Sequence, residues 1–127
     1  VGDEVIRTFA ECLRVAAGPD HIVGRIGGEE FAILLQAANA GSARLFAEGV
    51  RTRFSTLPMP TLPEGLRRTA SFGVAQWAEG ESVTGLFIRA DAALYEAKKA
   101  GRDRVRQSIS QPDGIVRRRA NAAEKPA

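Results

Sequence analysis

The sequence contains a single cysteine, Cys12, and no hydrophobic run long enough to cross a membrane. One cysteine excludes an internal disulfide and favours a reducing compartment. A membrane helix requires about 20 consecutive apolar residues, and the N-terminus shows no signal peptide. We therefore expect a cytoplasmic segment without membrane contact, or the cytoplasmic end of a membrane-anchored protein.

Net positive charge is also low outside one short region. The formal net charge of the 127 residues is +3, but the last twenty carry four basic and two acidic groups. The remaining body is close to neutral and lacks the broad positive field of a dedicated nucleic-acid binder. The run Arg117-Arg118-Arg119 is typical of a solvated tail. We expect no nucleic-acid partner.

Apolar residues repeat at three- and four-residue steps in three segments, which predicts three amphipathic helices. These helices lie near residues 5–16, 43–54 and 86–97, and Ser42 and Ser82 are the expected N-caps of the second and third. Between them, a hairpin turns at Gly27-Gly28, where positive φ favours glycine. Strands are expected over 31–35, 69–77 and within 102–109.

This order of elements favours an α+β sandwich of the ferredoxin-like kind. The run Phe31–Leu35 is apolar without alternation, as expected of a strand buried on both faces, yet the chain offers few strands to flank it. Residues 1–109 form the predicted domain. Residues 110–127 are polar and aperiodic, which predicts a disordered C-terminal tail.

Two carboxylates follow the hairpin glycines directly, in Gly27-Gly28-Glu29-Glu30. Paired acids can hold a divalent metal, and a turn without side chains lets a ligand approach the backbone. A metal beside bare backbone suits phosphate chemistry. Without the acids, the glycines would indicate a turn and nothing more.

Five ordered blocks resemble the GGDEF domain of bacterial diguanylate cyclases, here with the GGEEF variant of its signature. The blocks span residue 2 to about residue 105 and are Gly2-Asp3, Arg25-x-Gly27-Gly28-Glu29-Glu30-Phe31, Ser71-Phe72-Gly73-Val74-Ala75, Ala90-Asp91-x-Ala93-Leu94-Tyr95-x-Ala97-Lys98 and Gly101-Arg102. The resemblance implies a fold related to the nucleotidyl cyclase and polymerase palm. It also implies condensation of two GTP into cyclic di-GMP, with release of pyrophosphate, in a homodimer served by an upstream sensory or dimerisation domain.

The same resemblance assigns roles to individual residues. Glu29 would bind Mg²⁺ or Mn²⁺, and Glu30 would assist the metals or the attacking hydroxyl. Gly27 and Gly28 would let the nucleotide lie against the hairpin. Asp3 would accept hydrogen bonds from the guanine edge, and Lys98 and Arg102 would hold the terminal phosphates. From pattern alone, the better interpretation of Asp3 is a first-turn acid favoured by the helix dipole. Lys98 is equally expected as a cation at a helix end, and Arg25 as a partner for a neighbouring acid on the hairpin.

The family pattern is incomplete in two places. The strand and helix that carry Asp-x-Asp-x-Phe-Lys-x-x-Asn-Asp in the family do not precede Gly2-Asp3 here, so we expect these 127 residues alone to be inactive. The alternative is a degenerate module that binds GTP or a partner without turnover. An inhibitory Arg-x-x-Asp site for product is replaced by Gly18 and His21, so we expect no product inhibition through it.

Overall fold

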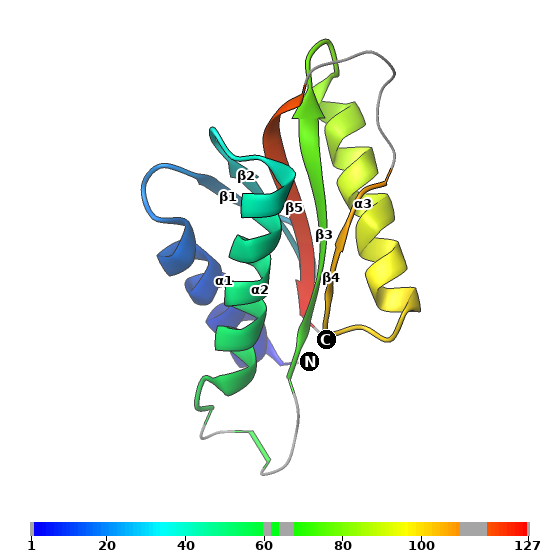
Figure 1. Ribbon diagram of the computed structural model, residues 1–127. Coiled ribbons are helices and arrows are strands. Elements are labelled where there is room, and N and C mark those ends of the chain that lie inside the picture. Colours follow the sequence, from blue (N-terminus) through cyan, green and yellow to red (C-terminus); the bar gives the residue numbers. More distant parts are fainter. Residues whose placement is uncertain (1, 60–61, 64–67, 110–116, 127) are drawn as a thin grey trace.

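The computed structural model describes residues 2–59, 62–63, 68–109 and 117–126 (Figure 1). It contains three helices and five strands in these residues. In chain order they are α1 (Asp3–Ala17), β1 (Ile22–Gly27), β2 (Glu30–Leu35), α2 (Ala40–Thr56), β3 (Ala70–Ala78), α3 (Val83–Lys99), β4 (Val105–Gln107) and β5 (Arg117–Pro126). None of the described helices is both long and apolar enough to span a bilayer.

The strands form one sheet in the order β1-β2-β5-β3-β4. All neighbouring pairs are antiparallel except β3 and β4, which are parallel. Helices α1 and α2 cover one face of this sheet and α3 covers the other (Figure 1). The predicted α+β class is therefore confirmed, with helices on both faces of the sheet.

The main core lies between the sheet and the pair α1 and α2. Its centre is Phe9, whose ring packs edge-on against Phe54 at 4.9 Å and Phe31 at 5.5 Å between centroids. On the opposite face, Leu34 packs with the smaller α3 cluster that includes Leu94. Strand β2 therefore contacts apolar groups on both faces, as its unbroken apolar run predicted.

Side chains at the helix N-termini satisfy backbone groups that the helices leave without partners. Ser82 Oγ accepts a hydrogen bond from the Gly85 N–H at 2.9 Å, so the predicted cap of α3 is confirmed. The predicted cap of α2 was misplaced by three residues. Asn39 is the N-cap and accepts from the Ser42 N–H at 2.8 Å, while Ser42 Oγ accepts from the Asn39 N–H in return. This reciprocal pair is a capping box.

The structure differs from the expected disordered tail over Arg117–Pro126, which forms β5 between β2 and β3. Glu124 pairs in register with both Phe31 and Phe72. Two flanking strands that would otherwise carry unpaired N–H and C=O groups offer hydrogen bonds to any extended segment. Backbone pairing of this kind requires no apolar alternation, so the composition of the segment did not reveal it. The remaining part of the tail lies outside the described residues.

The strand register also fixes which loops share an end of the sheet. Phe31, Glu124, Phe72 and Val105 lie in one row across β2, β5, β3 and β4. The hairpin turn just before Phe31 and the loop just before Val105 therefore lie at the same end. The start of α1 and the end of β5 lie there too (Figure 1).

Candidate functional site

The turn between β1 and β2 does not need glycine for its conformation. Neither Gly27 nor Gly28 has positive φ, contrary to the expectation from the hairpin pattern. A Cβ placed on either residue would meet no atom within 4 Å. Neither the backbone conformation nor the packing requires glycine here. The structural effect of the two glycines is therefore to leave the backbone of the turn exposed.

An arginine supports this turn from inside β1. Arg25 Nε donates to the Gly28 carbonyl at 3.1 Å, and Nη2 contacts the same oxygen. Its guanidinium also lies 5.8 Å from the centre of the Phe31 ring. The expectation that Arg25 pairs with an acid on the hairpin is wrong, because Arg25 donates to a backbone carbonyl in the turn. The pairing ties the turn to the strand that leads into it.

Both predicted carboxylates line a hollow formed by the turn. Glu29 and Glu30 are each half-buried, and the hollow of about 240 Å³ is completed by Ile26, Gly27 and Gly28. Two carboxylates beside bare backbone N–H groups make a wall that offers oxygen ligands to a cation and leaves room for a bulky group.

Asp3 lies beside a second hollow on the same hairpin. This hollow of about 320 Å³ is lined by Asp3, Ile6, Arg7, Ala10, Arg25 and Phe31. Arg25 and Phe31 directly flank the Ile26–Glu30 segment of the first hollow along the chain. The fold therefore places Asp3, from the first turn of α1, next to the carboxylate turn, although 25 residues separate Asp3 from Gly28.

Lys98 and Arg102 reach the same end of the sheet from the other side. Lys98 is half-buried in the last turn of α3, and Arg102 is exposed in the loop that leads to β4. The β2 and β4 strands are three strand spacings apart in the sheet, a separation of about 14 Å. The structure thus puts the predicted cations and carboxylates at one end but not in one hollow.

The acidic pair suits a divalent metal. Carboxylate oxygens are the ligands that Mg²⁺ and Mn²⁺ prefer, and Mg²⁺ in nucleotide sites takes one or two carboxylates together with substrate phosphates. Glu29 and Glu30 meet that requirement. Among the described residues there is no group of three or more acidic, histidine or cysteine side chains that could hold a metal without substrate.

Larger hollows lie elsewhere on the molecule. One of about 690 Å³ follows α3 and β4, and one of about 510 Å³ lies between α1 and α2. Neither contains the glycine turn or the paired carboxylates. The chemistry of the turn, and not the volume of a hollow, therefore marks the candidate site.

Comparison with known proteins shows the family to which the chain belongs. Residues 1–104 match the family described as diguanylate cyclase, GGDEF domain. The chain is 41% identical over 107 residues to diguanylate cyclase VdcA of Vibrio cholerae serotype O1, a match that covers 82% of this chain and 32% of VdcA. The chain therefore spans about a third of that relative.

Solved structures are similar in both sequence and fold. The active GGEEF domain of a diguanylate cyclase from Vibrio cholerae superimposes with a TM-score of 0.78 at 31% identity, covering 86% of this chain and 69% of that one. The GGDEF domain of DgcB from Caulobacter crescentus, solved in complex with c-di-GMP, gives 0.77 at 37% identity, covering 85% and 65%. With its Gly27-Gly28-Glu29-Glu30 turn, this chain belongs to the GGDEF-domain family of diguanylate cyclases.

Proposed function

We propose that this domain condenses two molecules of GTP into cyclic di-GMP. The observation that carries the proposal is the Gly27-Gly28 turn, which has no structural need for glycine yet exposes bare backbone beside two carboxylates. The family match and the diguanylate cyclases that resemble the chain support the same reaction.

Each half of the reaction is a phosphoryl transfer. The 3′-oxygen of one GTP forms a bond to the α-phosphorus of the other as the bond from that phosphorus to the β-phosphate bridging oxygen breaks. Pyrophosphate leaves, and the proton of the 3′-hydroxyl passes to a base, a role we assign to Glu30. Two such transfers close the ring. Positioning and charge neutralisation provide most of the catalysis in reactions of this class.

Asp3 provides a physical basis for choosing guanine. A carboxylate can accept the N1 and N2 protons of guanine as a pair, whereas adenine offers no such pair of donors. In this proposal the base occupies the hollow beside Asp3, and the phosphates extend along the glycine turn. Lys98 and Arg102 then neutralise the terminal phosphates from the α3 side.

Glu29 and Glu30 are the described residues that would hold a divalent cation, with the phosphates as further ligands. The cation, Mg²⁺ or Mn²⁺, would supply charge neutralisation at the transferring phosphate. Because catalysis requires two nucleotides that face each other, we propose a homodimer of the domain. An upstream sensory or dimerisation domain agrees with the greater length of the relative VdcA.

The test is synthesis of cyclic di-GMP from GTP by the longest natural polypeptide that contains this chain, with product measured by mass spectrometry. We expect Glu29→Gln to lower turnover at least 100-fold, the order of loss seen when one electrostatic group is removed from an active site. Because the Glu29 side chain is only half-buried on an open turn, we expect Glu29→Gln to leave the unfolding midpoint unchanged. Glu79→Gln, in the turn after β3, is the matched control and should retain activity. Full turnover by Glu29→Gln would contradict the proposal.

The placement of β5 favours a second candidate, a module that binds GTP without turnover. The slot between β2 and β3 is filled by the C-terminal segment, and the described residues include no third metal ligand. In this case the chain would bind a non-hydrolysable GTP analogue in the presence of Mg²⁺ but would release no pyrophosphate from GTP. Pyrophosphate release distinguishes the two candidates directly.

A further inference from the structure

The loop between α3 and β4 has an unusual backbone conformation. Three consecutive residues have positive φ: Gly101 at 125°, Arg102 at 62° and Asp103 at 46°. Glycine accepts this region, but residues with a Cβ adopt it rarely. Two adjacent non-glycine residues keep such a conformation when surrounding contacts hold it in place.

Several hydrogen bonds fix the backbone of this loop. The Arg102 N–H donates to the Ala97 carbonyl, and the Phe72 N–H donates to the Arg104 carbonyl, each at 2.9 Å. The Asp103 N–H donates to Ser71 Oγ at 3.1 Å, and the Ser71 side chain is fully buried in β3. The loop is therefore attached to both α3 and β3.

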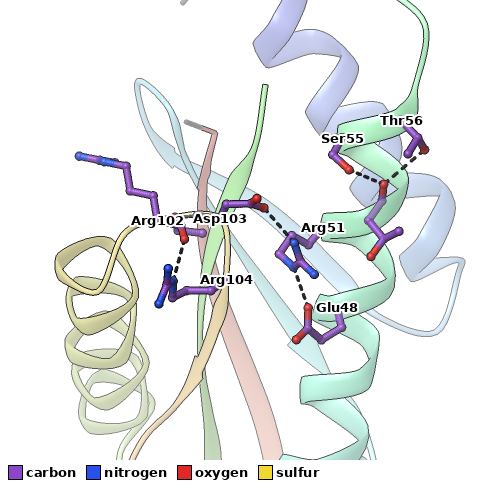
Figure 2. Close-up of polar contacts among 9 residues, drawn as sticks. Glu48, Arg51, Ser55, Thr56, Arg102, Asp103 and Arg104 are labelled. Atoms are coloured by element: carbon purple, nitrogen blue, oxygen red, sulfur yellow. Dashed lines mark hydrogen bonds and ion pairs between the residues drawn. The ribbon is translucent and has the colours of Figure 1, made fainter. Parts of the chain in front are cut away.

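A further contact comes from α2, on the opposite face of the sheet from α3. Arg51 Nη1 donates to Asp103 Oδ1 at 2.9 Å, and Arg51 Nε donates to Glu48 Oε1 at 2.7 Å. Figure 2 shows the Asp103 carboxylate turned toward Arg51. Glu48 fixes the guanidinium in the orientation that meets Asp103, so the three side chains form a chain of contacts from α2 to the loop.

The side chain of the preceding residue in this loop, Arg102, points the other way. The side chain of Arg102 is exposed and extends away from α2 (Figure 2). Its carbonyl accepts from Arg104 Nε at 2.8 Å, but within the described part of the chain its guanidinium has no hydrogen-bond or ion-pair partner. A free guanidinium on a rigid backbone is suited to receive a phosphate, which arginine binds through paired N–H groups.

We propose that Arg51 is a positioning residue for nucleotide binding, acting through Asp103 to hold the backbone that aims Arg102 at the terminal phosphates. This inference rests on the proposed function, because it takes GTP as the ligand of this domain. It adds a residue on α2 that contacts neither the glycine turn nor either of the hollows beside it.

If Arg51 served only to stabilise the fold, its loss would lower stability and would weaken the binding of all ligands alike. The positioning role predicts a different result. The side chains of Arg51 and Asp103 are 27% and 28% exposed, and a partly exposed ion pair contributes little to stability. Loss of Arg51 should therefore change phosphate binding more than folding. The loss should also be specific for ligands that carry the terminal phosphates, since Arg102 has no role toward the base.

The experiment measures binding of a non-hydrolysable GTP analogue and of GMP, both with Mg²⁺, by calorimetry. The variants are Arg102→Ala, Arg51→Met and the double variant, and Arg53→Met on the same helix is the control. We expect Arg102→Ala to weaken analogue binding about tenfold and Arg51→Met about fivefold, the size of one charge-assisted hydrogen bond. GMP binding should change less than about twofold, and the double variant should match Arg102→Ala.

The outcomes separate this inference from the proposed function. If Arg102→Ala leaves analogue binding unchanged, the phosphate role of Arg102 is wrong and the proposed function loses that part of its site. If Arg102→Ala weakens binding but Arg51→Met does not, only the positioning role is wrong. Additive losses of analogue affinity in the double variant, or an equal loss of GMP affinity, also overturn the positioning role of Arg51. If Arg51→Met folds poorly, Asp103→Asn provides the second test. It removes the charge of the same pair and should weaken analogue binding by the amount expected for Arg51→Met.

Discussion

Glu81 and Arg89 form a nearly buried ion pair at the start of α3. Arg89 Nε and Nη2 donate to the two Glu81 carboxylate oxygens, each at 2.7 Å, and the Ala78 N–H also donates to Glu81. The side chains are 7% exposed for Glu81 and 12% for Arg89. These hydrogen bonds, chiefly from Arg89, hold the pKa of Glu81 below its ordinary value of 4.5.

We expect Arg89→Met to lower the free energy of unfolding by about 3–5 kcal/mol at pH 7, because it leaves a buried carboxylate without its partner. A lowered pKa means that Glu81 stabilises the fold fully above its unfolded pKa and loses this effect as pH falls through the folded value. The difference between the variant and the parent should therefore shrink below pH 4.5. Urea unfolding at a series of pH values measures this.

Arg14→Met, which breaks the exposed pair with Glu11, is the control for that experiment. Its unfolding midpoint should equal that of the parent protein, because solvent screens an exposed pair. A difference for Arg89→Met that stays constant from pH 7 to below pH 4.5 would show that Glu81 is not the titrating group.

Candidate site residues could be proposed from the sequence only where they belong to a short motif. Glu29 and Glu30 follow two glycines, and Asp3 belongs to a block of the family pattern. The contact between Arg51 and Asp103 could not be predicted, because 52 residues separate the two. No local pattern records which distant side chain a loop will meet when the sheet forms.

At the scale of elements, α3 lies very close to β3 at one position. A Cβ on Gly73 would come within 2.1 Å of the Ala90 carbonyl oxygen and 2.3 Å of the Leu94 nitrogen. Both contacts are to backbone, which cannot rotate away as a side chain can. Gly73 therefore sets the distance between helix and strand, and with it the position of the end of α3 at Lys98.

We expect Gly73→Ala to lower the free energy of unfolding by about 3 kcal/mol, at the upper end of the cost of overpacking a core, since α3 must move as a unit. Gly24→Ala in β1 is the matched control, because a Cβ there meets nothing within 4 Å, and it should leave stability nearly unchanged. Denaturant midpoints of the two variants give the comparison. Equal midpoints would mean that α3 is not packed this closely.

The helices were the most predictable elements. Val5, Phe9, Cys12 and Leu13 are all buried on one face of α1, so their spacing predicted the helix correctly. The start of α2 was less predictable, because Asn39, Gly41 and Ser42 are all acceptable at a helix N-terminus. The backbone geometry decides which of these residues is the N-cap, and the sequence does not reveal that geometry.

At the scale of the whole molecule, the sheet depends on its last strand. Strand β5 pairs with β3 along most of its length and with β2 from Ala120 to Glu124, and Ala122 stands opposite both Ile33 and Val74. Its sequence, rich in alanine and charged residues, carries no strand pattern. Its position follows from the two strands beside it, which is why the sequence alone could not place it.

We expect Ala122→Pro to lower the free energy of unfolding by about 2–4 kcal/mol, since proline removes one ladder N–H and leaves its acceptor without a partner. Ala122→Ser keeps the N–H and should have an effect below about 1 kcal/mol. Hydrogen exchange at Ile33, which faces Ala122 across β2 and β5, should speed up in the proline variant only. Unchanged exchange there would contradict the central position of β5.

The placement of β5 also has a consequence for how the chain folds. The helices and the β1–β2 hairpin are built from contacts between residues close in sequence, so they can form early. The middle of the sheet cannot close until residues near the C-terminal end have arrived and aligned with strands made much earlier. Pairings between distant residues slow folding because a long loop must close first. We expect a slow final step, during which the facing edges of β2 and β3 are exposed to pairing with another chain.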